Sequence, residues 1–345
     1  MISVSGKSWL EKKVNNRYVE KIQQDYNFSN ILSRLIVSRN FTKGEIHLIK
    51  NDLFLSNVFQ NNSDFINAVK LTENIIRNKE TICILGDYDV DGSTATALLI
   101  RFLESIKHPY FYYIPDRKKD GYGASVKLFK KLILKKPKFV IMVDCGSTSS
   151  DAIDYLNKNN IKSLIIDHHE ITKPFPKANI IINPKKDNGY IQFNYLCATA
   201  LSYFFLDMLK KKIQCKIDIK KYLIFVLLAT VCDVMPIRNL NRLIAIIALK
   251  EFDLSKNQAF SELYKLSKKK NPININDLGY LIGPILNSGG RLGNSNDATE
   301  LLSSENKNII TKKSKTLIDL NDKRKKIETV IINNIDFNKI EKKNK

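Results

Sequence analysis

The chain has 345 residues, of which 43% are hydrophobic and 26% are charged, and its formal net charge is +21. Such a composition is that of a globular protein with room for two domains. It excludes a membrane-spanning protein, because the longest apolar run, residues 222–231, is shorter than the roughly 20 residues that cross a bilayer. The first residues contain no apolar signal core, so we expect a cytoplasmic protein.

The chain has 56 Lys and Arg residues but only 35 Asp and Glu residues. This surplus of positive charge favours a polyanionic partner, of which nucleic acid is the first candidate. The chain is also rich in Lys, Asn and Ile. An AT-biased genome produces that bias without selection for binding, so charge alone leaves the partner open. The five cysteines contain no CxxC pair, which argues against a zinc ribbon or a disulfide framework. We expect them to be small buried residues.

Residues 1–75 are predicted to be mostly helical, because apolar residues recur with helical spacing in 28–37 and again in 63–76. From Thr81 onward, strands and helices alternate. The predicted strands are 81–85, 110–114, 139–143, 163–166 and 179–182, and the helices between them are 93–106, 124–134 and 150–157. Ser93 or Thr94 can cap the first of these helices. The alternation predicts a doubly wound, mostly parallel α/β sheet over residues 76–190.

The remainder of the chain is predicted to be helical, with helices over 196–210, 219–230, 242–252, 260–268 and 276–286. A turn is expected at 287–293, where two glycines are adjacent. One long polar helix begins near Asn308 and ends in a frayed tail. These patterns divide the chain into an N-terminal helical segment (1–75), an α/β core (76–190), a helical part of the same domain (191–305), and a long connecting helix with its tail (306–345).

Polar side chains follow several of the predicted strands. The first strand is followed by three alternating acids, the third by one acid and the fourth by an Asp-His-His triplet: Asp87, Asp89, Asp91, Asp144, Asp167, His168 and His169. The carboxyl ends of parallel strands meet at one edge of a sheet, so these side chains are expected to lie close together. Like charges repel unless a cation lies among them. Carboxylate and imidazole groups suit Mn²⁺ or Mg²⁺, and the combination favours a divalent metal site over a solvated acidic turn.

The triplet Asp167-His168-His169 resembles the signature of the DHH phosphoesterases. The segment 86–92, Gly-Asp-Tyr-Asp-Val-Asp-Gly, is similar to the acidic motif of the RecJ branch, which comprises 5′→3′ exonucleases specific for single-stranded DNA. Segments 115–123, 229–236 and 283–292 also resemble RecJ segments, in the same order. Together these motifs are more specific than the triplet alone, which would indicate only the superfamily.

The resemblance implies two divalent ions, Mn²⁺ or Mg²⁺, with one carboxylate bridging them. The ligands that it implies are Asp89, Asp91, Asp144, His168 and Asp233, and Asp144 is the bridging group. The catalytic residues that it implies are His169, which contacts the scissile phosphate, Asp144 and Asp87. Without the resemblance Asp233 would pass unnoticed, because it ends an apolar helix. A carboxylate at that end of a helix is unfavourable against the helix dipole. A nearby cation would remove that penalty.

Four further residues resemble groups that bind the substrate. Arg117 is similar to the arginine that holds the 5′-phosphate, and a guanidinium fits a phosphate bidentately. Tyr122, followed by Gly123, can stack on a base or only pack its own loop. Arg291 can clamp a phosphate or close the turn in which it is expected to lie.

The activity that the resemblance implies is metal-dependent hydrolysis of single-stranded DNA from the 5′ end, with release of 5′-mononucleotides, in DNA repair and recombination. A single-strand-binding protein and a helicase are the further partners that it implies. Members of the family continue into a DHHA1-type domain and an OB-fold. We expect both to be absent from this chain, which ends at Lys345.

Two alternatives stay open. One is a DHH phosphoesterase for short oligonucleotides or cyclic dinucleotides, against which the RecJ-like segments 121–123 and 287–291 argue. The other is a truncated, non-catalytic nucleic-acid-binding protein, against which the presence of every implied ligand argues. Degradation of a long strand compared with a dinucleotide tests the first alternative, and titration with Mn²⁺ tests the second.

Overall fold

The computed structural model describes residues 3–4, 6–8, 10, 12–50, 55, 57–186 and 190–334. The chain divides into two compact units, Met1–Ser56 with Arg238–Leu243 and Asn57–Ile237 with Ile244–Lys345. The smaller unit contains α1 (Asn16–Tyr26), α2 (Asn30–Ser38) and α3 (Lys43–Lys50), so the helices expected there are present. Its buried Glu45 forms an ion pair with Arg238. The tail expected to be frayed, residues 335–345, lies outside the described residues.

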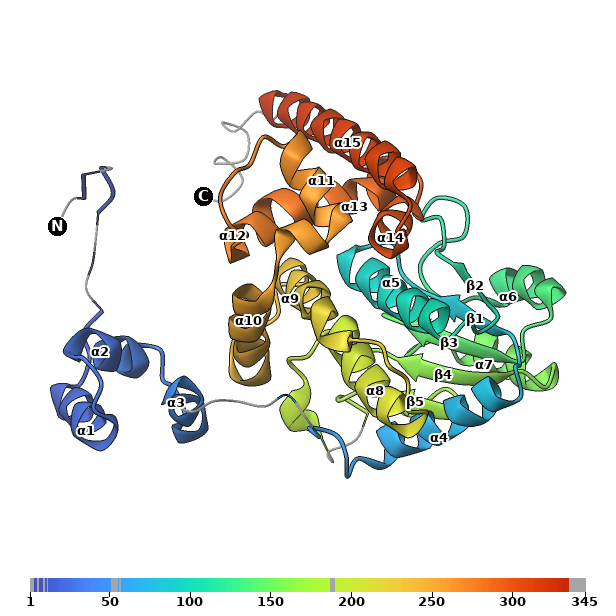
Figure 1. The fold of residues 1–345 in the computed structure, drawn as a ribbon, viewed down its shortest axis with the longest axis horizontal. Coiled ribbons are helices and arrows are strands. Elements are labelled where there is room, and N and C mark those ends of the chain that lie inside the picture. Colours follow the sequence, from blue (N-terminus) through green and yellow to red (C-terminus); the bar gives the residue numbers. More distant parts are fainter. Residues whose placement is uncertain are drawn as a thin grey trace, which may run out of the picture. The chain divides into compact units, whose positions relative to one another are not determined.

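The larger unit is built on a sheet of five parallel strands (Figure 1). The strands are β1 (Ile82–Leu85), β2 (Tyr110–Tyr113), β3 (Phe139–Val143), β4 (Lys162–Ile166) and β5 (Ile180–Ile182). Their order across the sheet is β2-β1-β3-β4-β5. Because β1 and β3 are buried along their whole length, they are continuous apolar runs rather than alternating ones. The predicted parallel α/β sheet is confirmed.

Helices cover both faces of this sheet. On one face, α6 (Val126–Leu132) and α7 (Ser150–Lys158) pack against alternate strand residues, such as Leu85 and Met142, as the period of two in a strand requires. The other face is covered by α4 (Ser63–Arg77), α5 (Val90–Ser105) and α8 (Ala198–Lys212). α8 contacts both α4 and α5, and each of the three helices contacts at least one strand. The sheet is therefore doubly wound, as predicted.

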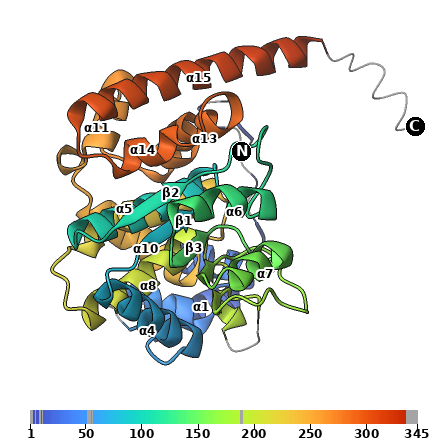
Figure 2. The ribbon, with the colours of Figure 1, turned by 90° about the vertical axis from the view of Figure 1, so that its right-hand side faces the viewer.

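The remaining helices of the larger unit pack outside α5 and α8. α9 (Leu223–Cys232) contacts both, and α14 (Asp297–Ser303) contacts α5. The long helix α15 (Lys307–Asn333) lies over α11 (Gln258–Leu266), α13 (Gly283–Leu292) and α14 (Figure 2). Of the other α-helices, α12 is Ile275–Asp277, and α10, Asn239–Glu251, is divided between the two units. Among the described residues, none of the helices combines the length and the apolar character needed to cross a membrane.

The turn predicted at 287–293 is wrong, because α13 continues through it to Leu292. Its glycines serve close packing instead of a change of direction. A Cβ at Gly290 would lie 2.7 Å from the carbonyl oxygen of Tyr88, and one at Gly289 would lie 3.0 Å from Leu317 of α15. Adjacent glycines therefore let one helix approach two other parts of the chain.

The predicted start of the first α/β helix is also wrong. α5 begins at Val90, and its N-cap is Asp89 rather than Ser93 or Thr94. The Asp89 carboxylate accepts the backbone N–H of Gly92 at 2.9 Å, which is the usual N-cap hydrogen bond. The acidic motif therefore forms the N-terminus of the helix, where negative charge is favoured by the helix dipole.

Candidate metal centre

The strand order creates a topological switch point between β1 and β3. From β1 the chain crosses to β2 on one side, and it later returns to β3 on the other side. The loops that leave these two strands therefore diverge, and parallel sheets of this order bind ligands in the resulting crevice. Residues 86–89 leave β1 and residues 144–149 leave β3, so the predicted acids emerge at this point.

The alternating acids lie in a tight connection between β1 and α5. Asp87 is 3% exposed and Asp91 is 1% exposed. Gly92 allows this tightness, since a Cβ there would lie 2.6 Å from the backbone nitrogen and oxygen of Asp87. Burial, reinforced by the charge of Asp89, raises the pKa of Asp87 to about 7. Burial and the charge of Asp91 raise the pKa of Asp89. The fold thus holds these carboxylates together at an electrostatic cost.

Asp91 also caps a helix that is distant in the sequence. Its two carboxylate oxygens accept the backbone N–H groups of Ala198 at 2.7 Å and of Thr199 at 2.8 Å. These are the first two residues of α8, whose own N-cap, Cys197, makes no side-chain cap hydrogen bond. Asp91 therefore satisfies two N-terminal amides of α8 and places negative charge at the positive end of its dipole.

Asp144 is the most constrained acid of the cluster. It follows β3 with a left-handed backbone φ of 61°, a conformation that Asp adopts more readily than most residues. Its side chain is buried, and neither carboxylate oxygen has a hydrogen-bond partner. Burial, followed by the charges of Asp89 and Asp91, raises the pKa of Asp144 well above its ordinary value. A buried carboxylate with two orphaned oxygens fits a bound cation.

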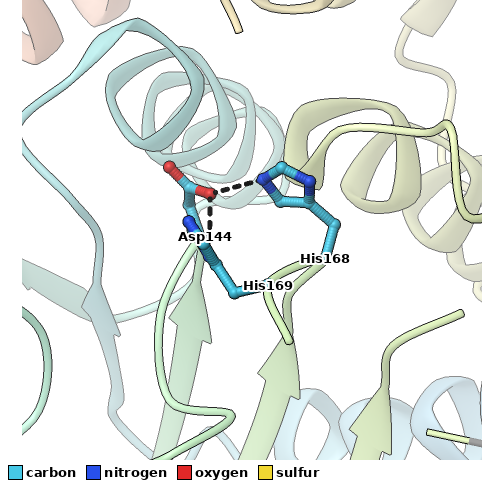
Figure 3. Close-up of side chains that lie close together, drawn as sticks. All are labelled: Asp144, His168 and His169. Carbon is cyan, nitrogen blue, oxygen red and sulfur yellow. Dashed lines mark ion pairs between the residues drawn. The ribbon is translucent and has the colours of Figure 1, made fainter. Parts of the chain in front are cut away.

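His168 lies among three carboxylates. Its Nε2 is 3.2 Å from Asp144 Oδ1 (Figure 3) and 3.6 Å from one oxygen each of Asp91 and Asp233. The imidazole is buried, and Nε2 has no hydrogen-bond partner. One ring nitrogen surrounded at this distance by acids from other elements is the arrangement expected of a metal ligand.

His169 lies beside His168, with their ring centroids 4.7 Å apart, and is held by Asp167. Its Nδ1 lies 2.8 Å from Asp167 Oδ1 and 3.8 Å from Asp144 Oδ1. Burial opposes ionisation of Asp167, but the hydrogen bonds from His169 and Ser147 keep its pKa well below the usual range. The same bond to Asp167 raises the pKa of His169. Asp167 thus fixes the orientation of a half-exposed imidazole at the edge of the cluster.

Asp233 reaches the cluster from the C-terminal end of α9, where it is the C-cap. Burial and the charge of Asp91 raise its pKa to about 6. Its Oδ2 lies 3.6 Å from His168 Nε2. The structure therefore places a carboxylate at the negative end of a helix dipole and beside other acids, and both effects disfavour its charge in the absence of a cation.

Three overlapping groups of these residues could hold metal ions, and in each group the ligand atoms lie within 4.8 Å of one another. The groups are Asp87 with Asp89 and Asp144, Asp91 with His168 and Asp233, and Asp144 with His168 and His169. Carboxylate oxygens and imidazole nitrogens are donors that suit Mn²⁺ and Mg²⁺. The orphaned atoms of Asp87, Asp144 and His168 fit such ions.

The four predicted substrate residues lie at different distances from this cluster. The Tyr122 hydroxyl lies 3.3 Å from the backbone oxygen of Asp144 and 3.5 Å from His169 Nδ1, and Gly123 adopts a φ of 70° beside it. The Arg117 guanidinium lies over the Tyr88 ring, 5.7 Å from its centroid. Arg291 lines a cavity of about 110 Å³ together with Cys232 and Arg324.

The sequence did not reveal the residues that orient the cluster. The Asn183 side chain donates to Ser147 Oγ at 2.8 Å and to the His169 backbone oxygen at 2.9 Å, and it ties the loops after β3, β4 and β5 together. Asp167 was part of the recognised triplet but had no role of its own. Its position directly before two histidines was the available signal, because a carboxylate next to a ligating imidazole commonly orients it.

A cavity of about 660 Å³ lies elsewhere in the larger unit. It is lined by residues at the ends of α5 and α9 that are remote from the acids, among them Arg101 and Tyr222. The lining of this cavity extends along α9 as far as Phe225, so about 10 Å of helix separates it from Asp233. Choosing a candidate site by cavity volume alone would therefore select a region other than the carboxylate–imidazole cluster.

The chain is similar in sequence and in fold to known proteins. Residues 81–230 match the family model for the DHH family, N-terminal domain. Two curated relatives, the single-stranded-DNA-specific exonucleases RecJ of Bacillus subtilis and Haemophilus influenzae, are 25% and 28% identical over 325 and 274 residues. These alignments cover 92% and 76% of this chain but 40% and 47% of the relatives. The chain therefore spans less than half the length of either relative.

Two solved structures show the same fold. RecJ from Thermus thermophilus in complex with Mn²⁺ matches with a TM-score of 0.78 at 20% identity, over 93% of this chain and 46% of that one. An exonuclease RecJ bound to manganese matches with a TM-score of 0.72 at 23% identity, over 79% of this chain and 69% of that one. Residues 81–230, the part of the chain that is similar to the DHH family, N-terminal domain, contain every clustered group except Asp233.

Proposed function

We propose that this chain carries the metal-dependent active site of a RecJ-like exonuclease, which hydrolyses single-stranded DNA from the 5′ end and releases 5′-mononucleotides. The observation that carries the proposal is Asp144, a buried acid with two orphaned oxygens among further acids and a histidine. Two relatives that align with most of this chain, at 25% and 28% identity, are single-stranded-DNA-specific exonucleases. The cofactor would be Mn²⁺ or Mg²⁺, with two ions bound.

The grouping of the acids supports two ions that share one ligand. Asp87 and Asp89 would hold one ion together with Asp144, and Asp91, His168 and Asp233 would hold the other. Because Asp144 also groups with His168, it would be common to both ions. Bound divalent ions would lower the pKa of water and neutralise charge on the phosphodiester. The protein's part is to hold the acids in one geometry, and the bound ions would favour their ionised form. The tight turn at Gly92 and the cap at α8 supply that rigidity.

His169 would contact the scissile phosphate. Because its Nδ1 is bonded to Asp167, its Nε2 lies on the opposite side of the ring and is available to a phosphate oxygen. Asp167 would not contact the substrate; it would hold the ring in place. The neighbouring Tyr122 is 53% exposed and would offer its ring to a base.

Positive groups would guide the strand to this site. Arg117 would hold the 5′-phosphate, and Arg291, with Gly123 shaping the Tyr122 loop, would complete the path. The net charge of +21 supports binding to a polyanion. Since such binding releases counterions, its affinity would fall steeply with salt.

The proposal is tested by the choice of substrate. With Mn²⁺, the protein is expected to release mononucleotides from a long single strand and to leave the duplex of the same sequence intact. A chelator should abolish the reaction. Cleavage restricted to a dinucleotide would support the short-substrate alternative. Binding of the strand with no Mn²⁺-dependent hydrolysis would contradict the catalytic assignment and support a non-catalytic nucleic-acid-binding protein.

Metal affinity should increase with pH. The pKa of Asp87 is raised to about 7 and that of Asp233 to about 6, so protons compete with the metal below these values. We expect the Mn²⁺ affinity to rise at least about tenfold between about pH 5.5 and pH 8. In the metal-free protein the sign is opposite: raised carboxyl pKa values mean that stability falls as pH rises through this window.

Calorimetric titration in two buffers of different ionisation enthalpy measures both the affinity and the protons released. The release should be larger at the lower pH, where more of the carboxyl groups are protonated before the metal binds. An affinity that is constant across this range, with no proton release, would contradict the prediction.

A further inference from the structure

The ring of Tyr88 connects the two segments that carry the proposed phosphate-binding arginines. Tyr88 lies between Asp87 and Asp89. The Arg117 guanidinium carbon lies 5.7 Å from the centroid of its ring. A Cβ at Gly290 would lie 3.1 Å from Tyr88 Cβ and Cδ2, so the α13 backbone packs directly against the side chain. Arg291 is the next residue of α13.

The backbone around Arg117 is ordered by its neighbours. Asp116 accepts the backbone N–H groups of Lys118 and Lys119 at 2.9 and 3.1 Å, and Asp120 accepts the N–H of Asp116 and the hydroxyl of Tyr113. The turn that carries Arg117 is thus fixed to the end of β2. Nothing in these hydrogen bonds determines where the long Arg117 side chain points.

The Arg117 side chain itself is exposed, and among the described residues it has neither a hydrogen bond nor an ion pair. The guanidinium lies over the Tyr88 ring. Arg stacks on aromatic faces by cation–π attraction, and the planar guanidinium keeps its N–H donors free at the edges when it does so. A stacked Arg117 therefore keeps the donors that a phosphate needs.

We infer that Tyr88 is a positioning residue that orients Arg117 toward the 5′-phosphate of the strand. Its backbone belongs to the acidic turn, its ring lies under Arg117, and its edge rests on α13. Tyr88 therefore links Arg117 to the acidic turn and to the segment of α13 that carries Arg291. This inference rests on the role proposed above for Arg117, but it does not depend on hydrolysis.

The test is binding in a chelator, where no strand is cleaved. Fluorescence anisotropy compares a 3′-labelled single strand that carries a 5′-phosphate with the same strand ending in a 5′-hydroxyl. Tyr88→Leu should weaken binding of the phosphorylated strand about 2–5-fold and leave binding of the hydroxyl strand unchanged. Tyr88→Phe retains the aromatic face and should bind both strands like the wild type.

A double-mutant cycle separates positioning from general disruption. If Tyr88 acts through Arg117, Tyr88→Leu should have no further effect on binding of the phosphorylated strand once Arg117→Met is present. Additive losses would overturn the inference, and so would equal weakening of both strands. If Arg117→Met does not change the preference for the 5′-phosphate, the proposed role of Arg117 fails and this inference fails with it. Absence of hydrolysis in the earlier assay would contradict only the catalytic proposal.

Discussion

Replacing Asp144 by Asn is expected to make the metal-free protein more stable and to remove its tight binding of Mn²⁺. Asp144 is buried with two orphaned oxygens among other acids, and an amide has no charge to repel them. Its N–H groups can donate to the neighbouring carboxylates, and Asn tolerates the left-handed φ of 61°. We expect a gain of about 1–4 kcal/mol in the free energy of unfolding without metal.

Urea unfolding in a chelator measures this gain, and calorimetric titration with Mn²⁺ measures the loss of affinity. Asp319→Asn is a matched control, because Asp319 is exposed on α15, far along the chain from the cluster. That variant should change stability by no more than about 0.5 kcal/mol and should bind Mn²⁺ normally. Unchanged Mn²⁺ binding in Asp144→Asn would contradict the assignment of Asp144 to the metal centre, and lower stability without metal would contradict the electrostatic argument.

Replacing Asp91 by Ala is expected to have the opposite effect on stability. Both Asp91 oxygens accept backbone N–H groups at the start of α8, and these buried donors would lose their partners. Hydrogen bonds to a charged group contribute about 1.5–3 kcal/mol each. The loss of two of them should lower the free energy of unfolding by about 3–5 kcal/mol, with or without metal.

Two variants show whether the cap is responsible. Asp91→Asn retains one carbonyl acceptor and should lose about half as much stability as Asp91→Ala. Asp151→Ala removes an exposed acid from the first turn of α7 and should cost only about 0.3–1 kcal/mol, the usual dipole contribution. If Asp91→Ala destabilised the protein only in the presence of Mn²⁺, the residue would act as a ligand alone and the cap would be unimportant.

These two predictions distinguish acids that are adjacent in space but differ in their surroundings. Neither carboxylate oxygen of Asp144 accepts a hydrogen bond, so a bound cation would stabilise its charge. Asp91 has two donors from α8 and remains satisfied without one. Functional sites often lower the stability of a protein. In this cluster we expect only some of the acids to lower it.

The local pattern was sufficient for the strand ends. Buried parallel strands are short apolar runs, so the bounds of β1, β3 and β4 were predicted to within one or two residues. The polar residues that follow each strand could then be identified from the sequence. The topology of a parallel sheet then brought Asp87, Asp144 and His168 to one edge. The family resemblance supplied Asp233, which no periodicity could have indicated.

The amino-acid sequence by itself thus determined the sheet, its helices and the residue types available at its carboxyl edge. Tertiary structure alone decided what each residue does there. The bond from Asp91 to Thr199 joins residues 108 positions apart, and the glycines of α13 pack against Tyr88 instead of forming a turn. Periodicity reports which face of an element is buried. It does not indicate which distant residue that face will contact. Those long-range contacts determine the protonation and the orientation of the side chains in this candidate metal centre.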